Sequence, residues 1–311
     1  MHSPNPTVPL DVLTVADMCV DLVLTGDVRP RFHQFEQLID DYELELGGSA
    51  NIFACQLAKL GARVGVIGQV GQDAYGEFVL NKLLGTGVDI SRVTRHATLK
   101  TGLGVALAEP GDRAILTYLG TIDATQPNDL AHDVLTAAHH WHIASYFLLQ
   151  SLRRHWPGWL RQCRDAGMTI SLDVNWDPED RWEGVTDLLP LVDVFFPNEN
   201  EAMAIAGEKD VRRATERLAD LGPTVVTKCG KDGVLAINGK QVWQLRPADI
   251  DGPPVQVVDS IGAGDNFDAG FIRAWLLHRP PDECLALGHR CAVASLRCAG
   301  GIQGQLQELV S

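Results

Sequence analysis

The sequence is short of basic residues: 26 lysines and arginines stand against 40 aspartates and glutamates, for a formal net charge of −14. Nucleic acids and anionic membranes attract positive surfaces, so neither is expected as the main partner. No apolar run approaches the ~20 residues that cross a bilayer, and residues 1–9 are polar and proline-rich, unlike a signal peptide. We therefore expect a cytoplasmic protein. ATP binding stays open, because local amide groups and a metal can overcome the overall negative field.

Several motifs are also missing. The seven cysteines are odd in number and lack CxxC spacing, which favours free thiols over a disulfide framework or a zinc site. No Walker A pattern occurs. Gly65, Gly68 and Gly71 lack the G-x-G-x-x-G spacing of a dinucleotide site. A P-loop enzyme is thus excluded, and a dehydrogenase is disfavoured.

The chain alternates apolar strand-like runs with helical stretches, which predicts an α/β fold whose mostly parallel sheet is covered by helices on both faces. We expect a single domain over residues 1–311 with a small β-sheet lid formed by segments near 24–46 and 100–119. The second segment predicts a hairpin, with strands 101–108 and 113–118 around the turn 109–112. Residues 12–23 predict one strand.

The stretch 257–271 organises the rest. Two valines end a strand, Gly262-Ala263-Gly264 forms a turn, and an apolar helix follows to Leu277. Backbone N–H groups of such a turn can converge on an anion at the helix N-terminus. Asp265 comes directly after the last glycine, where a carboxylate beside a phosphate is useful as a proton acceptor. The alternative is a plain helix cap.

The stretch from Asp259 to Gly270 resembles the second signature of the PfkB-type (ribokinase-like) carbohydrate kinases, with Ser260 where threonine is commoner. The resemblance covers residues 12–301. It implies a ribokinase-like fold and ATP-dependent phosphorylation of a sugar hydroxymethyl group. Asp265 would be the general base, and Gly262, Ala263 and Gly264 would supply the anion hole. It also implies a homodimer joined through the lid.

The same resemblance assigns the sugar site. Asp21 matches an aspartate that grips sugar hydroxyls, whereas Asp17 is balanced between a site role and a turn cap. Gly47 and Gly48 match the first signature, Gly-Gly-x-x-x-Asn, in which the glycines and the asparagine contact the sugar. Asn51 comes one residue early, and Ile52 takes the usual asparagine position.

Nucleotide and metal roles follow in the same way. Asn198 and Glu201 match the Asn-x-x-Glu motif that organises magnesium, a hard cation that prefers oxygen ligands; the alternative is a helix cap. Asp259, with carbonyl groups of turn 296–301, would hold a potassium ion. The residues implied in ATP binding are Asn198, Lys228, Gly230, Gly233, Ser260, Gly262, Gly264, His289 and Ala292.

The run from His139 to His142 has the composition of a metal-binding segment. On a strand, however, His140 and His142 would lie on one face and His139 on the opposite face. We interpret it as a polar strand. Relatives that phosphorylate 2-keto-3-deoxygluconate have arginines where this chain has Leu119 and Asp177, which favours a neutral acceptor such as fructose or ribose. A nucleoside kinase and a non-catalytic sugar or nucleotide sensor remain alternatives.

Overall fold

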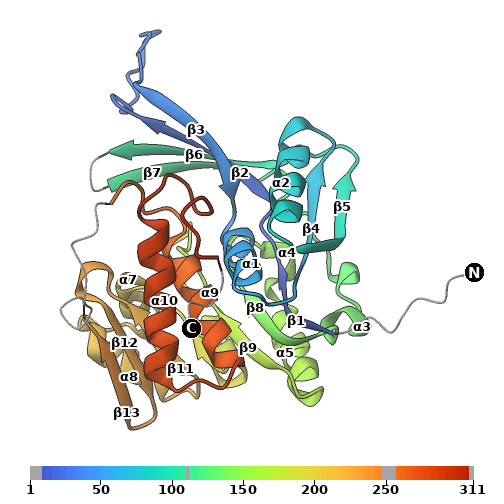
Figure 1. Ribbon diagram of the computed structural model, residues 1–311, viewed down its shortest axis with the longest axis vertical. Coiled ribbons are helices and arrows are strands. Elements are labelled where there is room, and N and C mark those ends of the chain that lie inside the picture. Colours follow the sequence, from blue (N-terminus) through green and yellow to red (C-terminus); the bar gives the residue numbers. More distant parts are fainter. Residues whose placement is uncertain (1–8, 110–111, 247–256, 308–311) are drawn as a thin grey trace, which may run out of the picture.

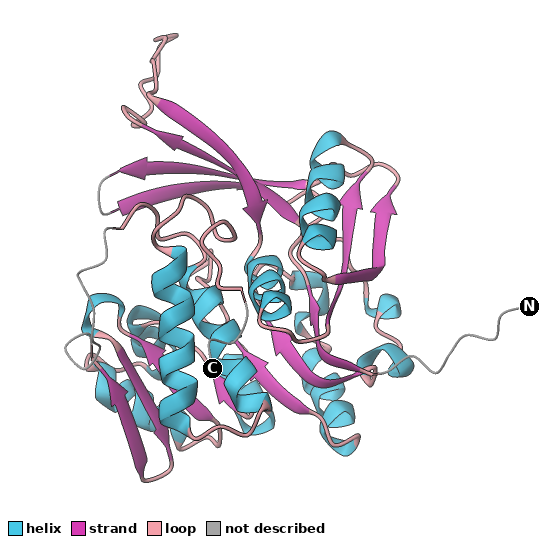
Figure 2. Ribbon diagram, in the orientation of Figure 1, coloured by secondary structure: helices cyan, strands magenta, loops and turns pink. Residues whose placement is uncertain are grey.

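The computed structural model describes residues 9–109, 112–246 and 257–307. In this part of the chain the strands form two separate sheets, a large one with helices on both sides and a smaller one above it (Figures 1 and 2). The α/β fold predicted from the sequence is confirmed.

The large sheet has nine strands in the order β13-β12-β11-β10-β9-β8-β1-β4-β5. All neighbours pair in parallel except at the β11–β12–β13 edge, which is antiparallel. The strands are β1 (Leu10–Val15), β4 (Val64–Gly71), β5 (Asp89–His96), β8 (Ala138–Ile143), β9 (Thr169–Leu172), β10 (Val194–Phe195), β11 (Thr224–Lys228), β12 (Val234–Asn238) and β13 (Gln241–Leu245).

Two hydrophobic clusters, one on each face of this sheet, bury its β-branched side chains. The first cluster contains α1 (Ser49–Lys59), α2 (Ala74–Gly85), α9 (Ala263–Leu276) and α10 (Pro281–Ser295). The second contains α3 (His132–Leu135), α4 (Gln150–Arg153), α5 (Trp156–Asp165), α6 (Val185–Leu188), α7 (Glu199–Ala206) and α8 (Val211–Ala219). None of the helices in the described residues combines the length and apolar character needed to cross a bilayer.

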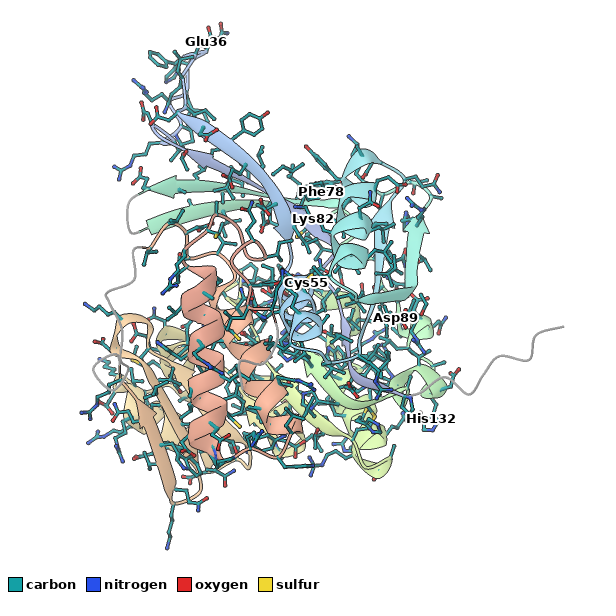
Figure 3. The ribbon with its side chains drawn as sticks, in the orientation of Figure 1. Glu36, Cys55, Phe78, Lys82, Asp89 and His132 are labelled. Atoms are coloured by element: carbon teal, nitrogen blue, oxygen red, sulfur yellow. The ribbon has the colours of Figure 1, made fainter. Side chains whose placement is uncertain are left out.

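The smaller sheet has the order β3-β2-β6-β7, with β2 (Cys19–Thr25), β3 (Asp41–Gly47), β6 (Gly102–Glu109) and β7 (Asp112–Tyr118). The predicted hairpin is confirmed as β6 and β7, although residues 110–111 of its turn lie outside the described residues. Residues 26–40, between β2 and β3, contain no strand and project from the body, with Glu36 near their tip (Figure 3).

The prediction of a single strand over residues 12–23 is wrong. The chain leaves the large sheet after Val15 and enters the small sheet at Cys19. Ala16, Asp17 and Met18 between them are buried, so the apolar pattern continues through the break and hides it. This crossing places Asp17 and Asp21 where the two sheets meet.

Candidate functional site

A cleft of about 830 Å³ lies between the small sheet and the carboxyl ends of the large sheet's strands, the usual place for ligands in open α/β folds. It gathers ten of the residues singled out from the sequence, although they come from widely separated segments. These are Asp21, Gly48, Asn198, Glu201, Lys228, Gly230, Ser260, Gly262, Gly264 and Asp265.

Asp265 lies in the first turn of α9, directly after the glycine turn. Gly262 caps the helix with φ 72°, and a β-carbon there would stand 2.8 Å from the Cα atom of Gly301, so the turn requires glycine. Asp265 is 8% exposed. Burial, and next the negative charge of Asp173, raise the pKa of its carboxyl group to about 8. A carboxylate with such a pKa suits proton transfer near neutral pH.

Ser49, the first residue of α1, connects Asp265 to the opposite wall of the cleft. Its hydroxyl lowers the pKa of the Asp265 carboxyl group, and it accepts a hydrogen bond of 2.9 Å from the side-chain amide of Asn175. Sequence reasoning missed Ser49. Its position directly after the paired glycines, at a helix start, was the available signal.

Asp17 proves to be a helix cap. Its carboxylate accepts from the backbone N–H groups of Ser49 and Ala50 at 3.0 and 3.1 Å. It also accepts from the hydroxyl of Ser145 at 2.6 Å. Asp17 is buried beneath the cleft and does not line it. Of the two roles that the sequence left open for Asp17, the structure therefore favours capping.

Lys228 lies at the end of β11, with its ammonium group 2.7 Å from Asp173 and 3.1 Å from Asp268. Burial alone would lower the pKa of Lys228, but these two carboxylates raise it. Burial would raise the pKa of Asp173, but Lys228 lowers it, while burial keeps that of Asp268 well above its usual range. Lys228 is therefore an ion-paired cation at the cleft. Sequence reasoning did not single out Asp268. Asp268 comes three residues after Asp265, and residues at that spacing lie on the same side of a helix.

Asp21 enters the cleft from β2, packed between two glycines. A β-carbon on Gly47 would lie 2.6 Å from the Asp21 carboxylate, and one on Gly104 would lie closer still. Asn51 is different: its side-chain amide donates to the carbonyl of Gly47 at 2.9 Å, and it is fully buried. Ile52 lines the cleft in its place. The side chain of Asn51 is directed inward and does not line the cleft, so its contact with the substrate stays a prediction.

Asn198 and Glu201 form a reciprocal cap at the start of α7: each side chain accepts from the other's backbone N–H, at 2.9 and 2.8 Å. Glu201 is buried, and burial, followed by the charge of Asp173, raises its pKa to about 7. Excess negative charge of this kind suits a cation. The described residues contain no ready-made group of three metal-ligating side chains. Magnesium takes one or two protein carboxylates plus waters and phosphates, so a single buried glutamate is enough for the predicted role. The capping and metal readings are therefore compatible.

Seven predicted residues lie outside the lining of the cleft, namely Gly47, Asn51, Gly233, Asp259, Ala263, His289 and Ala292. Asp259 ties two turns together, since its carboxylate accepts from the N–H groups of Ile261 and Gly300. Gly233 closes a turn at φ 93°, where a β-carbon would strike the carbonyl of Leu245.

The histidine run behaves as a strand. His140 and His142 are buried on β8, and both contact the hydroxyl of Ser171 at 2.8 Å. His142 also stacks on Phe53. Burial lowers the pKa of each to about 3, so both are neutral. Their role is to pack the sheet.

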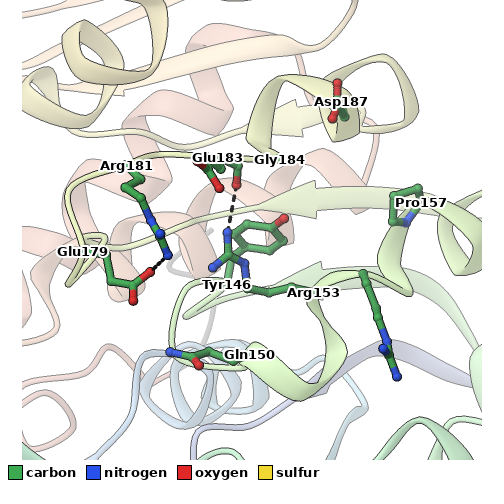
Figure 4. Close-up of a pocket in the computed structure, with 10 residues that line it drawn as sticks. Tyr146, Gln150, Arg153, Pro157, Glu179, Arg181, Glu183, Gly184 and Asp187 are labelled. Atoms are coloured by element: carbon green, nitrogen blue, oxygen red, sulfur yellow. Dashed lines mark hydrogen bonds and ion pairs between the residues drawn. The ribbon is translucent and has the colours of Figure 1, made fainter.

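A second hollow, of about 540 Å³, lies outside the cleft on the side of α4 and α5 (Figure 4). Its three arginines share the wall with three acidic residues. Arg153 donates to the carbonyl of Glu183 at 3.0 Å, and Arg181 pairs with Glu179. The hollow thus has no surplus of positive charge for an anion.

Comparisons with known proteins match most of this chain. The pfkB family carbohydrate kinase model matches residues 10–308. The 2-dehydro-3-deoxygluconokinase of Bacillus subtilis is 28% identical over 92% of this chain and 93% of its own length. The fructokinase of Klebsiella pneumoniae is 33% identical over 80% of this chain and 82% of its own.

Solved structures show the same fold. The adenosine kinase of Sinorhizobium meliloti has a TM-score of 0.82 at 22% identity, with 94% of this chain and 96% of that chain covered. The Arabidopsis thaliana ribokinase, complexed with ribose and ATP, has a TM-score of 0.79 at 23% identity, with 96% of each chain covered. Both likenesses confirm the ribokinase-like architecture.

Proposed function

The chain belongs to the pfkB family of carbohydrate kinases, and we propose that it transfers the γ-phosphoryl group of ATP to a hydroxymethyl group of a neutral sugar. The observation that carries this proposal is the placement of Asp265. Its carboxyl group is buried beside a glycine turn that faces Ser49 and Asp21 across one cleft.

In the proposed reaction Asp21 and the backbone at Gly47 and Gly48 orient the acceptor. Asp265 takes the proton of the acceptor hydroxyl as that oxygen forms its bond to the γ-phosphorus. The bond from phosphorus to the bridging oxygen breaks, and ADP leaves with the electron pair. Ser49 holds the Asp265 carboxylate for this step. The N–H groups of residues 262–265, at the N-terminus of α9, stabilise the transferring charge.

ATP and magnesium are the proposed cofactors. Glu201, with Asn198, would hold the magnesium, which when bound neutralises the polyphosphate charge. Ser260, Gly262, Gly264, Lys228 and Gly230 line the cleft where the phosphates would lie. Potassium at Asp259 and the 296–301 turn stays part of the proposal. The Asp259 carboxylate accepts hydrogen bonds from two backbone N–H groups. A potassium ion would therefore share this carboxylate with those two donors.

A neutral acceptor is supported by charge. In the part of the chain that the structure describes, Lys228 is the only basic residue lining the cleft, and Asp173 and Asp268 neutralise it. Asp177, at the position of an arginine in acid-sugar kinases, is buried and accepts backbone N–H groups. A sugar carboxylate would find no free cation there. This favours an acceptor like that of the fructokinase over that of the 2-dehydro-3-deoxygluconokinase.

A nucleoside acceptor is the second candidate, because the fold is shared with an adenosine kinase. A sensor without catalysis is the third; the buried Asp265 with its raised pKa argues against it. A homodimer through the lid and a cytoplasmic location belong to the same proposal and stay predictions.

The test measures ADP release with MgATP across neutral sugars, polyols, acid sugars and nucleosides. We expect turnover on a neutral sugar and its loss in Asp265→Asn, with ATP affinity largely kept. Near-normal turnover in Asp265→Asn would overturn the mechanism. A strong preference for an acid sugar would overturn the acceptor class. ATP binding without any turnover would favour the sensor.

A further inference from the structure

Asn266 and Gln305 carry two primary amides in the interior, with exposed fractions of 0% and 6%. Neither has a part in the reaction described so far. A buried amide costs free energy unless its donors and acceptors are paired. Gln305 keeps one such cost, because its side-chain carbonyl oxygen has no partner among the described residues. Apolar side chains would fill this space without that cost, so packing alone does not account for the two amides.

Asn266 connects the glycine turn to the C-terminal segment, defined as residues 300–306. Its side-chain amide donates to the carbonyl of Gly262 and to that of Gly301, both at 2.8 Å. The Gly262 carbonyl also accepts from the backbone N–H of Asn266 at 2.9 Å. The two turns are in close contact, since a β-carbon on Gly262 would lie 2.8 Å from the Cα atom of Gly301. One side chain therefore holds two adjacent turns together.

Gln305 fixes the orientation of the Asn266 amide. Its side-chain nitrogen donates to the Oδ1 atom of Asn266 and to the carbonyl of Ile52 in α1, both at 2.9 Å. Because Oδ1 is engaged in this way, the Asn266 amide cannot flip, and its nitrogen faces the two carbonyl groups. Ile52 lines the cleft, and α1 lies beside α9 (Figure 1). Gln305 thus joins the two helices next to the cleft.

The glycine turn supplies the proposed anion hole, so its orientation matters for the reaction. The first N–H groups of a helix have no acceptor inside that helix, and their direction follows from how the preceding turn is held. A peptide group is planar, so a fixed Gly262 carbonyl also fixes the plane with which α9 begins. Such donors stabilise a transition state best when they are oriented before the reaction, and a small displacement is costly.

We propose that Asn266, oriented by Gln305, is a positioning residue for the anion hole of residues 262–265. Asn266 does not line the cleft, so it acts on the transferring phosphoryl group through the glycine turn. The inference rests on the proposed kinase function and gives the C-terminal segment a part in it. Loss of either amide then affects the transition state more than the bound substrates, and so lowers kcat more than it raises KM.

The chain offers a matched control in Gln56 of α1. Gln56 is fully buried and exchanges two hydrogen bonds with the backbone of Leu306, at 2.9 and 3.1 Å. It anchors the same C-terminal segment with the same kind of side chain as Gln305, but its two bonds go to Leu306 and not to the glycine turn. Gln56→Ala should lower the melting temperature as Gln305→Ala does and leave kcat near that of the wild type.

The experiment measures kcat and the KM values for ATP and for the best acceptor of the panel. We expect kcat to fall about tenfold or more in Asn266→Ala. It should fall less in Gln305→Ala, which keeps the Asn266 amide, and both KM values should change less than about threefold. Asn266→Ser should recover part of kcat, because a serine hydroxyl can donate to the carbonyl four residues earlier, which is that of Gly262.

Binding of a transition-state mimic gives a second measurement. Calorimetry compares the affinity for MgADP alone with that for MgADP together with aluminium fluoride, an anion that takes the place of the transferring phosphoryl group. We expect Asn266→Ala to weaken binding of the mimic and to leave the affinity for MgADP unchanged, because only the mimic requires an oriented anion hole. Gln56→Ala should bind both as the wild type does.

Unchanged kcat in Asn266→Ala, or an equal fall in Gln56→Ala, would overturn the inference and leave the kinase function intact. No turnover by the wild type with any acceptor would instead overturn the proposed function. In that event the aluminium fluoride titration tests the positioning alone: weaker binding in Asn266→Ala supports it, and equal binding overturns it. Thermal melting checks that each variant is folded. If Asn266→Ala is not, Gln305→Ala and Asn266→Ser are compared with Gln56→Ala in the same way.

Discussion

Lys228 donates to the carboxylate of Asp173 across 2.7 Å, although the two residues belong to the ends of β11 and β9, which are separated in the sheet by β10. Asp268 of α9 receives the same ammonium group at 3.1 Å. The pair thus joins two strand ends to the helix that carries Asp265. Both carboxylates are buried, so their charge depends on this one cation.

We expect Lys228→Met to lower the free energy of unfolding by ~3–5 kcal/mol, because it leaves buried carboxylates without their partner. The double variant Lys228→Met/Asp173→Asn should recover part of the loss, since Asp173 is the carboxylate whose pKa Lys228 lowers. Urea denaturation at neutral pH measures both. The exposed Lys240→Met is the matched control. A loss below ~1 kcal/mol in the single variant would show that the network contributes little to stability.

The pKa of Asp265 determines the expected pH dependence. A general base acts when deprotonated, so kcat/KM for the acceptor should rise with pH through a pKa of about 8 in the free enzyme. The Ser49 hydroxyl lowers that pKa. Ser49→Ala should therefore move the limb of the profile to higher pH.

The measurement is a pH–rate profile of kcat/KM for the wild type and Ser49→Ala, with the exposed Ser91→Ala as control. A limb that moves to lower pH, or stays in place in Ser49→Ala, would contradict the role given to this hydroxyl.

The glycine turn and the Asn198–Glu201 pair could be predicted from sequence because each is a short segment whose chemistry is local. The sheet topology brings Lys228 into contact with Asp173 and Asp268. Because the three residues are far apart in the sequence, no sequence spacing predicts this contact. Similarly, the apolar run through residues 12–23 continues across two sheets, because the break at Ala16 is itself buried. The motif offset at Asn51 was visible, whereas the inward direction of its side chain required the fold.

Glu201 has a pKa raised to about 7 by burial, which has a consequence for stability. Its neutral form is favoured in the folded chain, so its contribution to stability is present at acidic pH. That contribution is lost as the pH rises from the ordinary glutamate value of 4.5 towards 7. Glu201→Gln should remove this loss in metal-free buffer. It should also weaken the stabilisation by Mg²⁺ and raise the Mg²⁺ concentration for half-maximal activity by about tenfold or more.

Thermal melting against pH, with and without Mg²⁺, separates the two effects of Glu201→Gln. Glu199→Gln changes a carboxylate of the same helical turn that does not line the cleft, and should behave as the wild type. Equal Mg²⁺ requirements in Glu201→Gln and the wild type would place the cation elsewhere.

Gly104 of β6 lies against Asp21 and belongs to neither of the two signatures found in the sequence. A β-carbon there would stand well inside contact distance of the Asp21 carboxylate, so the carboxylate must move in Gly104→Ala. We expect KM for the acceptor to rise about tenfold or more, because a displaced hydrogen-bonding group costs ~1–3 kcal/mol. KM for ATP should change little, since Asp21 serves the acceptor. Gly85→Ala in α2, where a β-carbon meets nothing within 4 Å, is the control. Steady-state kinetics with each substrate varied in turn decides the matter: an unchanged acceptor KM would mean that the position of Asp21 does not govern acceptor binding.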